Sequence, residues 1–300
     1  MESEGAVVKS DDELVKGKIS TSTLAKMWQS AFGLNVDRFF SSPEIELQPV
    51  PPYNYYRFTF ARPGDGEFYG RLMRRIGYES AERSEFGEAA LEIAEGEKVL
   101  DVGSGTGNFS TRCRGEYKGL ETNPVAVEDA AKLGRNVHLG LVEDEVPESY
   151  DAVVAFQVLE HVDDPKEFIK ACVRCLRPGG RLILSVPDMN GFVGYATNEL
   201  LNYPPHHMTW WTESSLRALI ADCGCEPIKV WYEPLRKLHL CGALSAIFWP
   251  RGERHLVSSI RFRIMRLGIR VLSRIAASKW DHVPFIKGHT MMVVATKTQT

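Results

Sequence analysis

Three glycines, Gly103, Gly105 and Gly107, come directly after residues 99–102, which are apolar except for Asp101. The apolar run predicts a buried strand, and the glycines predict a tight turn where that strand ends. Because glycine has no side chain, the backbone of such a turn can lie very close to a bound ligand. Turns of this kind open the sites of nicotinamides, flavins and other adenosine-containing ligands, so the turn alone does not identify its ligand.

Two further features narrow the choice of ligand. Glu121 ends the next predicted strand, where a carboxylate can accept hydrogen bonds from both hydroxyls of a ribose. The Gly-x-Gly-x-Gly spacing also lacks the third glycine at the place where a pyrophosphate-binding helix turn has it. The pattern therefore favours an adenosine ligand with an amino-acid tail and no phosphate.

Strand and helix patterns alternate through the centre of the chain, which predicts an α/β, Rossmann-like, mostly parallel sheet. Helices are predicted over residues 124–133, 165–176 and 212–222, and the second begins with Asp164-Pro165, an N-cap followed by a first-turn proline. The predicted strands are residues 98–102, 117–121, 136–140, 150–156, 181–186, 227–232 and 290–297, the last of them antiparallel.

The regions on either side of this core have their own patterns. In the N-terminal part, a helix over residues 21–40, an extended proline-rich linker over 43–52, a strand over 53–60 and helices over 68–77 and 82–94 are predicted. We expect a disordered tail (1–20), a helical and strand cap (21–95), a cofactor-binding core (96–233), a basic helical insertion (234–288) and a final strand with its tail (289–300).

Residues 99–109, 119–124, 151–165 and 176–187 resemble, in order and spacing, the successive motifs of class I S-adenosylmethionine-dependent methyltransferases. The resemblance implies that S-adenosylmethionine is the cofactor and methyl transfer the activity. It also implies roles for single residues. Asp101 and the turn Gly103, Ser104, Gly105, Thr106 and Gly107 would face the methionine part, Glu121 the ribose, Thr122 the adenine edge, and Phe156 with Gln157 the amino-acid tail.

The sequence departs from this family after the third predicted strand, where an acidic side chain usually receives the adenine amino group. Leu141 and Val142 stand there, so Glu143 or Asp144 is the candidate substitute. The first crossover helix, expected over residues 108–115, is also shorter than is usual in the family.

Histidines are the candidates for the catalytic step. Transfer from a sulfonium needs an acceptor atom in line with the methyl carbon, and a hydroxyl acceptor must lose its proton. Imidazole is suited to that removal near neutral pH. His161 follows the fourth predicted strand, and His206 and His207 lie further along, so all three are expected near the carboxyl edge of the sheet. Glu160 is interpreted as structural rather than catalytic.

Two prolines precede the paired histidines, and Trp210 and Trp211 follow them. This order predicts either a stiff, aromatic-walled loop that stacks on a sugar or apolar acceptor, or indoles that only fill core under the next helix. Residues 203–211, together with 25–33 and 68–72, resemble a methyltransferase branch that acts on sugars and cell-surface polysaccharides. That resemblance implies a small-molecule or glycan acceptor, with a sugar or lipid-linked saccharide as the leading choice.

Three other functions stay open at this point. A quinone-like or other apolar small molecule is the alternative acceptor. A binding protein that keeps the fold without turnover is a second alternative, suggested by the missing adenine-side acid. A nicotinamide-dependent oxidoreductase is disfavoured by the glycine spacing.

Charge is distributed unevenly over the 300 residues, whose net charge is −3. Residues 251–287 hold nine Lys and Arg against Glu253 and Asp281, so the rest of the chain is acidic, which argues against nucleic-acid binding. Within this basic region Arg263, Arg266, Arg270 and Arg274 form one stripe of a predicted helix. The stripe predicts peripheral contact with an anionic membrane through residues 240–278, or a solvated face of a helix packed on its own domain or on a second copy in a homodimer.

The first twenty residues are polar and hold no apolar run of the kind that a secretory signal needs. We therefore expect a cytoplasmic protein, at most peripheral on the inner face of the membrane. Six cysteines suit a reducing compartment. Cys172 and Cys175 have the spacing of a metal-binding pair, but they fall inside a predicted helix and no second pair exists, so no metal site is predicted.

Overall fold

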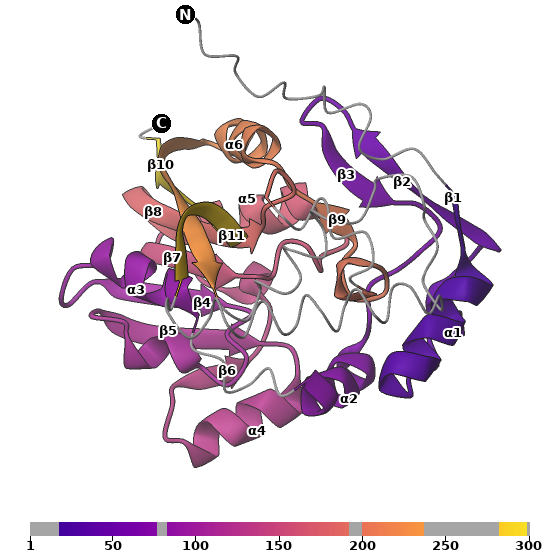
Figure 1. Ribbon diagram of the computed structural model, residues 1–300. Coiled ribbons are helices and arrows are strands. Elements are labelled where there is room, and N and C mark those ends of the chain that lie inside the picture. Colours follow the sequence, from indigo (N-terminus) through magenta and orange to yellow (C-terminus); the bar gives the residue numbers. More distant parts are fainter. Residues whose placement is uncertain (1–17, 77–82, 192–199, 237–281, 299–300) are drawn as a thin grey trace, which may run out of the picture.

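The computed structural model describes residues 18–76, 83–191, 200–236 and 282–298 (Figure 1). Its centre is a seven-stranded sheet in the order β10-β11-β8-β7-β4-β5-β6. Neighbours from β8 to β6 run parallel, whereas β11 is antiparallel to both β8 and β10. The predicted Rossmann-like sheet with one antiparallel strand is confirmed. The strands are β4 (Lys98–Val102), β5 (Glu116–Glu121), β6 (Val137–Leu139), β7 (Tyr150–Phe156), β8 (Leu176–Pro187), β10 (Cys225–Arg236) and β11 (His282–Lys297).

β4 and β7 have the predicted ends, but the last two strands are longer than predicted. Their ladder continues beyond Tyr232 to the pairs Pro234 with Lys287 and Arg236 with His282. Residues 234–236 and 282–288, which were assigned to the helical insertion, therefore lie in strands. The rest of that insertion, with its arginine stripe, lies outside the described residues, so the predicted domain boundaries stay a prediction.

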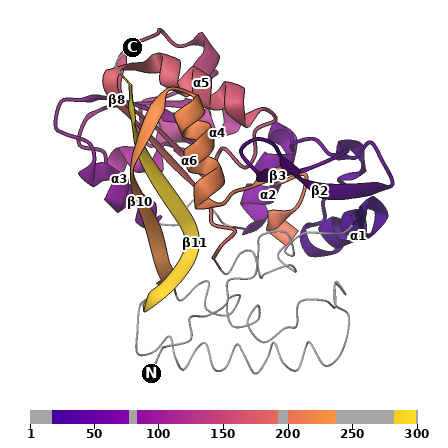
Figure 2. The same cartoon turned by 90° about the horizontal axis from the view of Figure 1, so that it is seen from above.

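Helices cover both faces of the sheet (Figure 2). On one face α5 (Pro165–Cys175) and α6 (Glu213–Asp222) pack with alternate residues of the strands, such as Leu100 and Val153. On the other face α3 (Ser84–Leu91) packs against Val99 and Val154. α4 (Pro124–Lys132) connects β5 to β6. A parallel sheet buried on both faces explains why its strands are almost continuously apolar in the sequence.

The signals that predicted the helix starts are visible as hydrogen bonds. The Asp164 carboxylate accepts the backbone N–H groups of Lys166 and Glu167, both at 3.1 Å. Thr212 and Ser215 form a reciprocal capping box at the start of α6. Cys172 and Cys175 lie on α5 as buried free thiols in the core of the domain.

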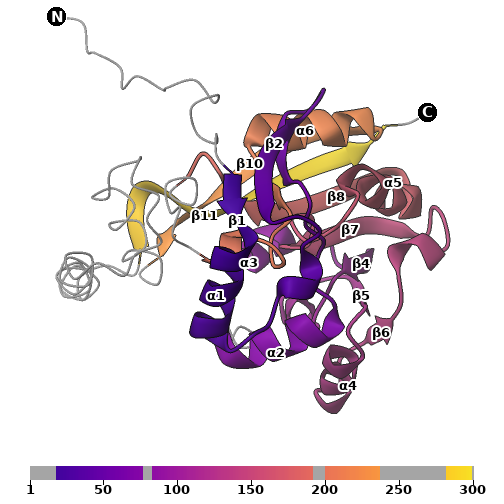
Figure 3. The same cartoon turned by 90° about the vertical axis from the view of Figure 1, so that its right-hand side faces the viewer.

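The N-terminal cap is a separate four-stranded antiparallel sheet, β1-β2-β3-β9, with α1 (Thr21–Phe32), the 3-10 turn η2 (Asp37–Phe39) and α2 (Gly66–Ile76). Its strands are β1 (Lys18–Ser20), β2 (Glu44–Val50), β3 (Tyr55–Phe58) and β9 (Thr209–Trp210). The cap faces the viewer in Figure 3. Because β9 comes from the segment just before α6, the cap sheet is completed by the same loop that carries His206 and His207.

Three predictions for the cap are wrong. The first helix ends at Phe32 rather than at residue 40, because Gly33 adopts φ +66° and its N–H caps the carbonyl of Gln29. The expected linker over residues 43–52 contains strand β2. Its Pro49 is tolerated because β1 pairs only with residues 44–46 of β2, so that side of Pro49 needs no N–H donor. Residues 18–20, assigned to the tail, form β1.

Across the described ranges, no helix has both the length and the apolarity that crossing a membrane requires.

Candidate active site

The glycine turn and the first histidine flank the point where the order of the sheet reverses. After β4 the chain runs outward through β5 and β6, and then returns to place β7 on the other side of β4. Ligands of open α/β sheets bind at this kind of switch point, beyond the carboxyl ends of the strands. The loop after β4 carries residues 103–107, and the loop after β7 carries residues 157–164.

The turn is built from positive φ angles, +70° at Gly103, +56° at Gly105 and +72° at Gly107. A Cβ added at Gly103 would lie 2.6 Å from a methyl of Val158, so the turn and the loop after β7 are in direct contact. A Cβ at Gly105 would meet nothing within 4 Å. The backbone at Gly105 therefore borders open space, where a ligand can approach it.

Glu121 lies beside this turn, as the sequence predicted. One carboxylate oxygen accepts the N–H of Gly105 at 2.8 Å, and the other accepts those of Thr122 and Asn123 at 2.8 and 2.9 Å. A carboxylate has about four acceptor sites, so the oxygen that accepts from Gly105 keeps one of them for a ribose hydroxyl. Three backbone donors thus orient Glu121 toward the turn before any ligand binds.

Asp101 is the residue before the last in β4 and is 2% exposed. It accepts a hydrogen bond from the hydroxyl of Tyr117 at 2.8 Å. Burial raises the pKa of Asp101 to about 7, against the opposing effects of that hydrogen bond and of Arg83. Near pH 7 a change in the polarity around Asp101 therefore shifts the balance between its protonated and ionised forms.

Phe156, the last residue of β7, and Gln157, which follows it, have different surroundings. The ring of Phe156 packs with Phe86 and Phe109 at centroid distances of 4.9 and 4.8 Å, so this side chain is core and only its backbone faces the site. Gln157 has φ +56° and donates its N–H to the Ser185 carbonyl at 2.9 Å. The side-chain amide of Gln157 donates to the hydroxyls of Ser185 and Thr290 at 3.4 and 3.5 Å, so its role in binding an amino-acid tail stays a prediction.

Arg83 was not predicted. Its guanidinium donates to the Phe156 carbonyl at 3.0 Å, and its charge acts on Asp101, Glu160 and His161. A cation at this point is suited to the carboxylate of an amino-acid tail. No spacing signal in the sequence marks this residue, because it reaches the site from the segment before α3.

On the adenine side, the candidate substitutes Glu143 and Asp144 lie in the 3-10 turn η5 (Val142–Asp144), and both side chains are exposed. The backbone carbonyl of Glu143 accepts from Arg174 at 2.7 Å. The carboxylate of Glu143 is exposed, and its contact with adenine stays a prediction. The short crossover segment is the 3-10 turn η4 (Asn108–Thr111), shorter than the predicted helix.

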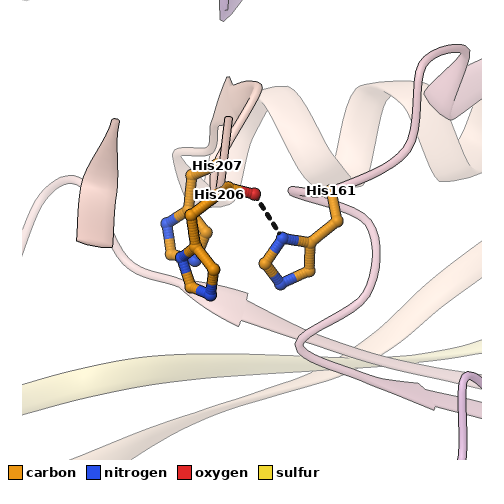
Figure 4. Close-up of side chains that lie close together, drawn as sticks. All are labelled: His161, His206 and His207. Atoms are coloured by element: carbon orange, nitrogen blue, oxygen red, sulfur yellow. Dashed lines mark hydrogen bonds between the residues drawn. The ribbon is translucent and has the colours of Figure 1, made fainter. Parts of the chain in front are cut away.

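The three candidate catalytic histidines come together in one cluster, the histidine cluster (Figure 4). Ring centroids are 4.8 Å apart for His161 and His206, 4.9 Å for His161 and His207, and 4.4 Å for the stacked pair His206 and His207. Burial lowers the pKa of His161 to about 3 and that of His206 to about 4, and it lowers the pKa of His207 as well. All three rings are therefore neutral near pH 7.

Hydrogen bonds to carbonyls fix two of the tautomers. Nδ1 of His161 lies 2.5 Å from the carbonyl oxygen of His206, and Nδ1 of His206 lies 2.7 Å from that of Leu201. A carbonyl only accepts, so both Nδ1 atoms carry the hydrogen and both Nε2 atoms have a free lone pair. Tyr69 of α2 donates to the same His206 carbonyl at 3.0 Å, which ties the cap to the cluster.

Glu160 lies against the histidine cluster and is 0% exposed. One of its oxygens is 3.8 Å from Nε2 of His161 and 3.9 Å from Nε2 of His207. Neither carboxylate oxygen has a hydrogen-bond partner among the described residues. Burial raises the pKa of Glu160 to about 8. The sequence had suggested a structural role, but a buried carboxylate without a donor stabilises nothing by itself.

The two indoles that follow the cluster are core residues. Trp211 is 0% exposed and stacks on Tyr55 of the cap at 4.4 Å, and Trp210 is 9% exposed and donates to the Asn202 carbonyl at 2.7 Å. Of the two interpretations left open for this stretch, the core-filling one agrees with the structure. The indoles are therefore not a free platform for a sugar ring.

The sequence pattern of a family described as a methyltransferase domain matches residues 70–230, more than half of the chain. A ubiquinone biosynthesis O-methyltransferase of Pseudomonas savastanoi pv. phaseolicola is 32% identical over 165 residues, 47% of this chain and 71% of that enzyme. The enzyme of the same name from Idiomarina loihiensis is 35% identical over 107 residues, 32% of this chain and 44% of that enzyme. The chain thus spans less than half of one of these relatives and about seven tenths of the other.

Solved structures show the same fold. A Thermotoga maritima S-adenosylmethionine-dependent methyltransferase, described as a possible histamine N-methyltransferase, superposes with a TM-score of 0.53 at 20% identity, covering 78% of this chain and 98% of that one. A Haemonchus contortus phosphoethanolamine N-methyltransferase bound to S-adenosylhomocysteine gives 0.53 at 14% identity, covering 94% and 76%. With the family match and the sheet order, these findings show that the chain belongs to the class I S-adenosylmethionine-dependent methyltransferases.

Proposed function

We propose that this methyltransferase transfers the methyl group of S-adenosylmethionine to a hydroxyl oxygen of a small aromatic acceptor of the quinol type. The observation that carries the proposal is the histidine cluster, which presents two lone pairs beside the loop that contacts the glycine turn. Hydroxyl acceptors need a group that receives their proton, whereas amines can lose theirs to water more readily. The names of the curated relatives point to the same acceptor class.

The donor half of the site would hold the cofactor by its two ends. Glu121 accepts from the ribose hydroxyls, and the backbone at Gly105 borders the methionine part. Arg83 and Gln157 would receive the amino-acid tail. The acceptor oxygen attacks the methyl carbon, the carbon–sulfur bond breaks with its electrons on sulfur, and the hydroxyl proton passes to Nε2 of His161. S-adenosylhomocysteine and the methyl ether are the products.

An apolar aromatic acceptor is favoured over the saccharide that the sequence suggested. Sugar recognition relies on exposed aromatic platforms and many polar groups, but Trp210 and Trp211 are buried. The relatives described above are named for ubiquinone biosynthesis and not for polysaccharides. The sugar branch is therefore unsupported, and the quinone-like alternative replaces it.

The test is a panel of acceptors incubated with the full chain and methyl-labelled S-adenosylmethionine. The panel contains catechols, hydroxylated quinols, nucleotide sugars, lipid-linked saccharides and primary amines, and products are identified by mass spectrometry. We expect a methyl ether on a catechol or quinol. Methylation of saccharides or amines alone would refute the proposed acceptor, and cofactor binding without any product would support the non-catalytic alternative.

Membrane contact through residues 240–278 remains part of the proposal, since a lipid-soluble acceptor is reached from a membrane surface. A homodimer is also retained as a proposal. Sedimentation with anionic liposomes at low and high salt tests the first. Light scattering of the purified chain tests the second.

A further inference from the structure

We propose that His161, His206 and His207, with Glu160 beside them, bind one divalent transition-metal ion of the zinc type. No ligand spacing in the sequence predicts this site, because more than forty residues separate His161 from the histidine pair. The fold brings them together where the loop after β7 meets the loop before β9 (Figure 4).

The distances fit a small ion after a modest contraction. One ligand atom from each histidine lies within 4.8 Å of the others. At that upper limit an ion at the centre of the triangle would be about 2.8 Å from each nitrogen, while zinc–nitrogen bonds are about 2.0–2.1 Å. Each nitrogen therefore needs to approach the ion by less than about 1 Å. The stacked rings of His206 and His207, 21° from parallel, must also rotate about their side-chain torsions so that both lone pairs point at the ion.

The hydrogen bonds around the rings are those of metal ligands. A histidine that binds a metal through one nitrogen usually donates its other N–H to a carbonyl or carboxylate, which fixes the tautomer and the direction of the lone pair. The N–H of His161 is donated to the His206 carbonyl, and the N–H of His206 to the Leu201 carbonyl. Two of the three rings are thus already oriented with a free Nε2, before any ion is present.

Glu160 provides the independent observation. A fully buried carboxyl group with no hydrogen-bond partner within the described residues is costly in either protonation state, and a bound cation is one way to satisfy its oxygens. Its oxygen lies nearly equidistant from Nε2 of His161 and of His207, at 3.8 and 3.9 Å. An ion held by those imidazoles would be next to this oxygen, so Glu160 is placed to be the fourth ligand or to balance the charge.

The surrounding backbone holds these groups in place. The Glu160 carbonyl accepts the N–H of Met208 at 2.7 Å and that of Thr209 at 3.2 Å, and the latter residue begins β9. The two loops are therefore fastened together by hydrogen bonds on either side of the cluster. Three imidazoles and one carboxylate are ligands that zinc, iron(II) and nickel(II) accept, whereas magnesium and calcium prefer oxygen ligands.

The role of the ion rests on the proposed function. Bound beside the acceptor, it would hold the acceptor hydroxyl through oxygen and stabilise its ionised form, so that the proton leaves to solvent while the oxygen attacks the methyl carbon. In the metal-loaded chain the ion would thus replace the lone pair of His161 in promoting loss of the hydroxyl proton, whereas the acceptor and the transferred group are those of the proposed function. Metal binding itself is tested without any acceptor, so the two proposals can fail separately.

The experiment uses the full chain purified without a polyhistidine tag, stripped with a chelator and titrated with ZnCl2 by calorimetry, with the metal content measured by mass spectrometry. We expect about one zinc per chain. His161→Gln, His207→Gln and Glu160→Gln should each weaken binding by at least about tenfold. His138→Gln is the matched control, because His138 is exposed on β6 and outside the cluster, and it should bind zinc like the original chain.

Binding of S-adenosylhomocysteine by each variant reports whether that variant is folded. If one cluster variant fails to fold, the zinc affinities of the other cluster variants test the proposal. The proposal is overturned if the original chain takes up no zinc, or if folded cluster variants bind it as tightly as His138→Gln does. If the metal-free chain methylates a quinol as fast as the zinc-loaded chain does, the proposed role of the ion in methyl transfer is wrong. The titration then decides separately whether the cluster binds zinc.

Discussion

Replacement of Gly103 by alanine should have two energetic costs of similar size, backbone strain at a positive φ and a collision with Val158. The backbone at Gly103 has φ +70°, where a Cβ costs about 1–2 kcal/mol. The new methyl would also lie 2.6 Å from Val158, and forcing a methyl into packed surroundings costs about 1–3 kcal/mol. We expect Gly103→Ala to lower the free energy of unfolding by about 2–5 kcal/mol.

Gly134→Ala is the matched control. Its φ is +68°, and a Cβ there meets nothing within 4 Å, so it should cost only the backbone term of about 1–2 kcal/mol. The difference between the two variants measures the collision with Val158. In a Val158→Ala background the collision is removed, and the cost of Gly103→Ala should fall to that of Gly134→Ala.

The assays are urea denaturation and calorimetric titration with S-adenosylhomocysteine. Gly103→Ala should also weaken cofactor binding by about tenfold or more, or about 1.4 kcal/mol, because the displaced turn carries the Gly105 N–H that orients Glu121. Gly134→Ala should bind normally. Equal stability and equal binding in the two variants would show that the turn is not held against the loop after β7, and the geometry of the donor site would then be wrong.

Three other predictions test the site. Asp101 has a pKa of about 7 in the folded state against 3.8 in a model peptide, so between about pH 4 and 7 the folded state binds more protons than the unfolded state. The free energy of unfolding therefore falls as pH rises through this range, and Asp101→Asn should flatten the fall in denaturation curves. An unchanged slope would contradict the assignment. Glu121→Gln should weaken S-adenosylhomocysteine at least about tenfold in titrations, whereas the exposed Glu128→Gln should not. Trp28→Phe leaves the buried Pro204 carbonyl without its donor and should lower the free energy of unfolding by about 1–3 kcal/mol. It should also reduce turnover while cofactor affinity is preserved. Equal losses of turnover and of cofactor affinity would show that the cap does not act on the acceptor side alone.

The donor side of the fold could be predicted from the sequence because its signals are local. The strand before the turn is mostly apolar, with Asp101 as the exception, and it stops at Gly103, as β4 (Lys98–Val102) does. Glu121 sits at the end of the next strand in register, so its place beside the turn follows from the parallel pairing alone. Caps such as Asp164 act within three residues, which is why the start of α5 was predicted.

Elsewhere the sequence was insufficient because the structure depends on distant partners. β9 is two residues long and becomes a strand only because Tyr56 and Arg57 of the cap pair with it. The apolar pattern continues past Gly33, so the sequence pattern does not mark the end of α1 there. Glu160 looked structural because its burial, and its lack of a donor, are properties of the folded loops and not of its neighbours in the chain.

The acceptor side therefore depends on the cap more than on the core. The His206 carbonyl receives both Nδ1 of His161 and the hydroxyl of Tyr69, so α2 of the cap, the loop after β7 and the loop before β9 meet at one oxygen. Trp28 fixes the same loop from α1 by donating to Pro204 at 3.0 Å. Changes in the cap can thus move the histidine cluster while Glu121 and the glycine turn, which are held by core strands, stay in place. A family that keeps one donor site can acquire new acceptors in this way, and for the same reason the cofactor could be inferred from sequence motifs while the acceptor needed the folded structure.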